Sequence, residues 1–197
     1  VAAETLCNTG LVVLAGNNPY FSAMAMRLPA LLGVALIVYF LPRIAVHMGA
    51  DVQLTVWFSA INPLLIIDFV GGAHNDALMM GLVVLAIWLA YERRFWWAAI
   101  TVGVAACIKQ PALLAFYPVA LIRHPWKTLS WPDTSAAMLR LVGSLGAAVA
   151  AFVAISLATG LGFGWVDAAD VPGMIVTLAP FTLVGEGLRL VFEFFGQ

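Results

Sequence analysis

The chain alternates long apolar runs with short polar breaks. The run over residues 28–46 is close to the ~20 apolar residues that cross ~30 Å of hydrocarbon as a helix. This pattern predicts an all-α polytopic membrane protein in which residues 1–197 belong to one transmembrane domain. The expected helices lie at residues 28–46, 52–70, 77–91, 95–108, 112–122, 138–158 and 180–197, the last being the start of a further helix.

Three of these runs, 77–91, 95–108 and 112–122, are short for a bilayer of full thickness. Two interpretations of the last two runs remain open. Either the chain turns back at Lys109, or residues 95–122 form one long tilted helix. We prefer the turn, because a single helix would move the basic residues after it to the other side of the membrane.

Basic residues predict the orientation, because cytoplasmic loops carry an excess of lysine and arginine. If the chain turns at every polar break, six basic residues lie on one side, which we therefore expect to be cytoplasmic. The breaks at residues 16–20, 71–76, 109–110 and 165–173 then lie on the extracytoplasmic side of the cell membrane. The six are Arg43, Arg93, Arg94, Arg123, Lys127 and Arg140.

Composition supports a membrane protein and excludes several other classes. Hydrophobic residues make up 63% of the chain and charged residues 10%, with a mean hydropathy of +1.02. A net charge of −1 gives no basis for nucleic-acid binding. The spacing of Cys7 and Cys107 is not that of metal ligands, and we expect no metal site. Because the sequence starts without Met and ends within a helical pattern, we expect it to be the central part of a longer protein.

The densest polar cluster lies between the second and third apolar runs, in the sequence NPLLIIDFVGGAHNDALMMG. Asn62-Pro63 should kink the second helix. Ionisable groups at membrane depth are costly, so a cluster of them indicates a functional site. We expect Asp68, His74, Asn75 and Asp76 to face a substrate. The alternative is structural, with Asn75 or Asp76 capping the helix that begins at Ala77.

A second polar break, Lys109-Gln110-Pro111, ends the fourth run on the same side. Pro111 should stop the helix and present the Lys109 side chain. An ammonium recessed below the membrane surface requires a compensating anion, and we expect Lys109 to bind a phosphate, with Gln110 beside it. The alternative is a lysine that extends to lipid headgroups as an anchor.

A third candidate is the late loop GLGFGWVDAADVPG. Trp165 offers an aromatic face and Asp167 a carboxylate, a combination that can hold a sugar. The alternative is a tryptophan at the membrane interface in a solvated loop.

The segments NPL, GGAHNDALM and IKQPALLAF together resemble the actinobacterial polyprenol-phosphomannose-dependent α-1,6-mannosyltransferases, enzymes of the GT-C class. The resemblance implies a GT-C bundle of transmembrane helices. It also implies transfer of mannose from polyprenyl-phosphate mannose to a mannan lipoglycan, with inversion, on the extracytoplasmic face. The lipid-linked donor is a substrate, and no cofactor is implied. Further implied partners are the bilayer and the glycolipid acceptor.

In GT-C enzymes the catalytic base is typically an aspartate in the first extracytoplasmic loop, which precedes the region matched here. We therefore expect the base to lie outside this chain and leave the catalytic residue unassigned, with Asp76 and His74 as candidates. The competing function is a secondary transporter or a flippase for lipid-linked sugars, since broken helices also build transporter sites. Such sites lie near the bilayer midplane between paired repeats, whereas the polar breaks here gather at one rim.

Overall fold

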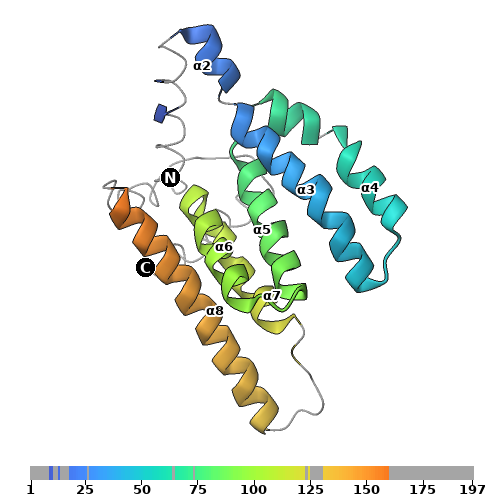
Figure 1. The fold of residues 1–197 in the computed structure, drawn as a ribbon, viewed down its shortest axis with the longest axis vertical. Helices are drawn as coiled ribbons and strands as arrows, with labels where there is room; N and C mark the ends of the chain where they lie inside the picture. The colour runs from blue at the N-terminus through green and yellow to red at the C-terminus, as the bar shows by residue number, and fades with distance from the viewer. Residues whose placement is uncertain are drawn as a thin grey trace, which may run out of the picture. The chain divides into compact units, whose positions relative to one another are not determined.

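The computed structural model describes residues 9–10, 13, 18–25, 27–63, 65–72, 74–122, 124 and 131–159. For Asp68 and Trp131 it describes only the backbone. All regular elements in these ranges are helices (Figure 1). They are α2 (Pro19–Ala25), α3 (Arg27–Met48), α4 (Val52–Ala60), η1 (Leu65–Gly71), α5 (Asp76–Tyr91), α6 (Phe95–Ile108), η2 (Gln110–Ala115), α7 (Phe116–Leu121) and α8 (Trp131–Ala158).

The expectation of an all-helical membrane protein is confirmed. In the described residues, α3 and α8 are long and apolar enough to cross a membrane, and α4 with η1 can be a third, broken span. The other apolar helices are shorter. By the rise of an α-helix, the 16 residues of α5 are about 24 Å long and the 14 residues of α6 about 21 Å. Both lengths fall below the ~30 Å of a typical hydrocarbon core.

The predicted kink at Asn62-Pro63 is present. The axis turns by 40° between α4 and η1. After the break, η1 is wound as a π-helix, with the amide of Gly72 donating to the Ile67 carbonyl at 3.2 Å and that of His74 to the Phe69 carbonyl at 3.0 Å. Such i to i−5 segments are rare and are frequent at functional sites. This one leads directly into the His74-Asn75-Asp76 segment.

The start expected for the helix over 138–158 is wrong. The structure begins α8 at Trp131, seven residues earlier. The polar sequence Pro132-Asp133-Thr134 suggested a loop. Proline is nevertheless tolerated in the first turn of a helix, because an N–H at that position would make no hydrogen bond within the helix. The predicted helix over 180–197 lies outside the described residues.

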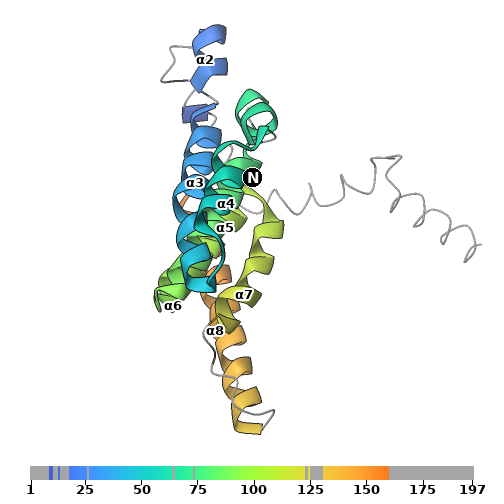
Figure 2. The ribbon, with the colours of Figure 1, turned by 90° about the vertical axis from the view of Figure 1, so that its right-hand side faces the viewer.

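The chain reverses direction at Lys109, as the two-helix interpretation of residues 95–122 expects. Lys109 has extended backbone angles (φ −143°, ψ 130°), and η2 and α7 then run back alongside α6 (Figure 2). Ala90 at the end of α5, Ala98 at the start of α6 and Val119 in α7 consequently share one buried cluster.

Small residues allow very close contact between α3 and α5. A Cβ on Gly33 would overlap the backbone of Ala77, and one on Gly81 would lie 2.6 Å from the Gly33 carbonyl oxygen. Ala77 and Gly81 are four residues apart and so present one small-residue face of α5 to α3. This crossing fixes the start of α5 against α3.

A second close crossing joins α6 to α8. A Cβ on Gly103 would overlap the Ala148 carbonyl. Side chains of α8 also donate hydrogen bonds to backbone carbonyls of α7, and lipid could not supply such donors. Arg140 Nε donates to the Ala120 carbonyl at 2.8 Å, and Ser144 Oγ donates to the Phe116 carbonyl at 3.1 Å.

Helices α3 and α5 end side by side in the same hydrogen-bonded motif. After α3, the amide of Gly49 donates to the Val46 carbonyl and that of Ala50 to the Ala45 carbonyl. After α5, the amide of Arg93 donates to the Ala90 carbonyl and that of Arg94 to the Leu89 carbonyl. This motif requires a left-handed residue after the helix, normally glycine. Gly49 occupies that position in α3 with φ 66°, but α5 has Arg93 there with φ 62°. A non-glycine residue in this conformation costs roughly 1 kcal/mol.

The α3–α5 crossing predicts that Gly33→Ala destabilises the protein. The added methyl group has to displace the Ala77 backbone, so we expect a loss of roughly 1–3 kcal/mol in the free energy of unfolding. The matched control is Gly146→Ala in α8, where nothing lies within 4 Å of the added carbon; it should be neutral or stabilising. Thermal unfolding in detergent measures both. Equal melting temperatures for the two variants would contradict the close crossing.

Candidate substrate site at the start of α5 and the end of α6

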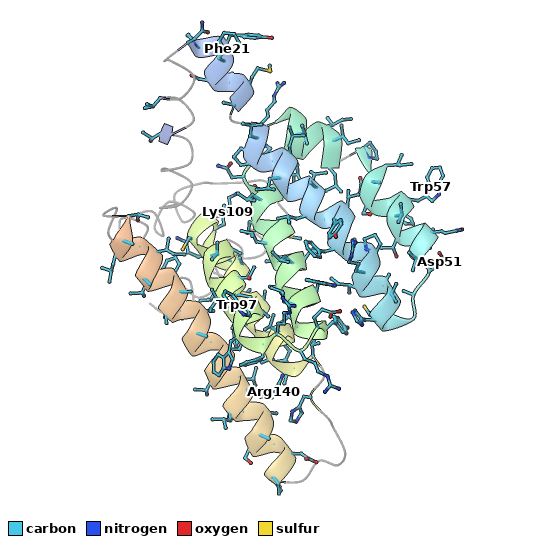
Figure 3. The ribbon with its side chains drawn as sticks, viewed as in Figure 1. Phe21, Asp51, Trp57, Trp97, Lys109 and Arg140 are labelled. Carbon is cyan, nitrogen blue, oxygen red and sulfur yellow. The ribbon has the colours of Figure 1, made fainter. Side chains whose placement is uncertain are left out.

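An ion pair connects two of the predicted site residues. Lys109 Nζ lies 2.6 Å from Asp76 Oδ1, with 44% of the lysine side chain and 30% of the aspartate side chain exposed. The pair is therefore accessible from outside the bundle. Figure 3 places Lys109 at one end of α6, with Trp97 toward the other end of the same helix.

Lys109 occupies this place because α6 stops one residue before it. Its amide still donates to the Ala105 carbonyl at 3.2 Å, but its backbone is extended and its carbonyl accepts from Ala112 at 3.1 Å. Pro111 lies in the first turn of η2, where a proline is tolerated, and prevents α6 from continuing. The lysine thus marks the point at which the chain turns back.

Asp76 occupies the first position of α5, next to the residue that contacts Gly33. The structural alternative, in which Asn75 or Asp76 caps this helix, is not found for Asn75. Asn75 is the N-cap residue, but its backbone is already helical and its side chain forms no capping hydrogen bond. The Asp76 carboxylate is directed to Lys109 instead. A carboxylate in the first turn is also favoured by the helix dipole.

The remaining predicted residues lie near the pair or outside the described structure. His74 is exposed, and in the described part of the chain no hydrogen bond of its ring is found; Gln110 is partly exposed at the start of η2. Asp68 lies in η1, but its side chain is outside the described structure, as are Trp165 and Asp167. The structure therefore brings together Asp76 and Lys109, with His74, Asn75 and Gln110 adjacent in sequence.

Sequence reasoning missed the partner of Lys109. The expectation was a lone ammonium that requires a phosphate, but the described structure already provides a carboxylate. The sequence contained part of the signal, since both residues were placed on the same side of the membrane at the ends of two consecutive short helices; the contact of those two ends was not in the sequence pattern. Both side chains of the pair are partly exposed, so an incoming anion can reach the ammonium. Lys109 can therefore contact an incoming anion without an uncompensated charge in the resting protein.

The described residues include no group of three or more histidine, cysteine, aspartate or glutamate side chains arranged to hold a metal ion. The described side chains of the candidate site include the ammonium of Lys109, the carboxylate of Asp76 and the imidazole of His74. An ammonium can stabilise negative charge on a phosphate, while the carboxylate and imidazole can bind hydroxyl groups or accept a proton.

The fold and the site define a polytopic helical membrane protein with a charged pair at one end of its helices. The sequence model of the family described as alpha-(1->6)-mannopyranosyltransferase, N-terminal domain, matches residues 4–125. The chain belongs to this family. No solved structure matches the chain at a significant level.

Several curated relatives carry the same description. Alpha-(1->6)-mannopyranosyltransferase A of Mycobacterium tuberculosis is 34% identical over 160 residues, which cover 80% of this chain and 31% of the relative. The protein of that name in Corynebacterium glutamicum is 28% identical, covering 94% of this chain and 40% of the relative. A probable alpha-(1->6)-mannopyranosyltransferase of Mycolicibacterium smegmatis is 31% identical, covering 90% and 36%. The chain thus spans about a third of the length of these relatives.

The structure separates His74 from Arg94 by the whole length of α5. If α5 crosses the membrane, single cysteines at these two positions should react with a membrane-impermeant maleimide from opposite sides of sealed cells. We expect labelling at His74→Cys in intact cells and labelling at Arg94→Cys only after permeabilisation. Labelling of both positions from one side would contradict the crossing of α5.

Proposed function

We propose that the full-length protein transfers mannose from polyprenyl-phosphate mannose to a mannan lipoglycan acceptor, forming an α-1,6 linkage on the extracytoplasmic face. The observation that carries the proposal is the Asp76–Lys109 pair at one end of two short apolar helices. Family membership supports mannosyl transfer. The accessible ammonium supports a donor whose leaving group is a phosphate.

The proposed reaction is a single displacement at the anomeric carbon of mannose. The acceptor oxygen forms a bond to that carbon while the bond to the phosphate oxygen breaks, and the acceptor hydroxyl proton passes to a base. Because the attack comes from the face opposite the phosphate, a β-linked donor gives an α-linked product. The polyprenyl phosphate leaves with increased negative charge, and the Lys109 ammonium stabilises that charge. The base stays unassigned.

Asp76 has a positioning role in this proposal. Its carboxylate holds the Lys109 ammonium at the site before the donor arrives, so that the lysine is not free to extend away to lipid headgroups. When the donor phosphate binds, it shares the ammonium with the carboxylate. His74 and Gln110 lie beside this pair in the sequence, as does Asn75, and we assign these residues to the hydroxyl groups of the sugars.

The short helices give a reason for this location. Because α5 and α6 are shorter than the hydrocarbon core, the pair at their ends can lie below the outer surface of the membrane. A phosphate attached to a polyprenyl chain is at the same depth. The location also separates this proposal from the transporter alternative, whose site would lie near the middle of the helices.

Lys109→Gln should lower the turnover of the full-length enzyme by about 10-fold or more, because about 1.4 kcal/mol of leaving-group stabilisation corresponds to a factor of ten. Lys109→Arg keeps the positive charge and should retain part of the activity. Transfer of labelled mannose from polyprenyl-phosphate mannose in membranes measures both variants. Asp76→Asn removes the holding charge and should have an effect in the same direction as Lys109→Gln. Unchanged donor affinity and turnover in Lys109→Gln would show that the lysine is only an anchor.

A further inference from the structure

The turn between α5 and α6, residues Glu92-Arg93-Arg94, lies at the end of the bundle opposite the candidate site. All three side chains are exposed. Neither the sequence resemblance nor the proposed reaction uses this turn. Two other described arginines already have partners. The guanidinium of Arg43 lies over the Tyr39 ring, and that of Arg140 lies over the Phe95 ring and donates to a carbonyl.

The backbone of Arg93 is in a conformation that favours glycine. The neighbouring helix α3 ends in the same motif with glycine, Gly49, at the equivalent position. The structure therefore contains the relaxed form of this turn and the strained form side by side. Strain at a residue that glycine would relieve is an indication that the side chain has a use.

The adjacent carboxylate does not neutralise the arginines. Glu92 Oε1 lies 3.0 Å from His47 Nε2, and the His47 ring is stacked on Tyr91 with 5.2 Å between the ring centroids. Glu92 is thereby held toward α3. Among the described residues, no carboxylate forms an ion pair with Arg93 or Arg94.

The start of α6 adds anion-binding groups at the same place. Arg94 is the N-cap residue, its side chain forms no capping hydrogen bond, and the first turn contains no acidic residue. Neither the N-cap side chain nor an acidic residue in the first turn therefore accepts from the first amides of α6, which carry the positive end of the helix dipole. Trp96 and Trp97 in this turn are 62% and 65% exposed. Exposed tryptophans are typical of the headgroup level of a membrane.

We propose that this turn is a docking site for the phosphate of an anionic membrane phospholipid. Arg93 and Arg94 contact the phosphate, the uncapped amides of α6 receive its oxygens, and Trp96 and Trp97 lie among the headgroups and upper acyl chains. Glycine at position 93 would relax the turn but would remove one of the two cations. The site is independent of the proposed mannosyl transfer.

The test measures binding of phosphatidylglycerol to the full-length protein in detergent, with phosphatidylcholine as the uncharged comparison. Arg93→Gly and Arg94→Gln should each weaken phosphatidylglycerol binding about fivefold, and the double variant should lose most of the preference for phosphatidylglycerol over phosphatidylcholine. Without added lipid, Arg93→Gly should melt at or above the temperature of the wild type, since it relieves the left-handed strain. Loss of binding then cannot result from misfolding.

The matched control is Arg27→Gln, which removes one arginine at the opposite end of α3 and should leave phosphatidylglycerol binding at this site unchanged. Two results would overturn the proposal. One is a double variant that binds phosphatidylglycerol as tightly as the wild type. The other is an equal loss of affinity in Arg27→Gln, which would show a general effect of net charge.

Discussion

The ion pair between Asp76 and Lys109 connects the first residue of α5 to the residue that ends α6. Its geometry depends on the close helix crossing next to it. The contact of Gly33 with Ala77 and Gly81 leaves no space for a side chain between α3 and α5 and so fixes the start of α5. Packing of α6 against α5 and α8 then places Lys109 opposite the carboxylate, with Gly103 against Ala148. The small residues at these crossings thus position Asp76 and Lys109, the charged residues that we propose act at the substrate site.

Much of this arrangement follows from the sequence alone. The apolar runs predict the helices, because the hydrocarbon core requires long uncharged segments whose backbone groups bond within the segment. Asn62-Pro63 predicts the kink between α4 and η1, because proline removes a backbone donor. Pro111 and the one-sided distribution of basic residues predict the reversal at Lys109. These signals are local or depend on simple counting, and they need no knowledge of which helices pack together.

The pairing of Lys109 with Asp76 could not be predicted in the same way, because it depends on the contact of two helix ends. The start of α8 was also mispredicted, since Pro132-Asp133-Thr134 fits both a loop and the first turn of a helix. Asn75 is a good capping residue by type, yet its side chain does not cap α5, and Asp76, also a capping type, forms an ion pair with Lys109. Asp76 thus suits a common local role but has a different partner, Lys109, which is distant in sequence.

The double-mutant cycle of Asp76→Asn and Lys109→Gln tests the central claim most directly. The free energy of unfolding of the full-length protein is measured for the wild type, both single variants and the double variant. If the carboxylate holds the ammonium, the sum of the two single-variant losses in unfolding free energy exceeds the loss in the double variant. The difference, the coupling energy, should be about 0.5–1 kcal/mol or more. Strict additivity of the two single effects would contradict the ion pair and, with it, the positioning role of Asp76.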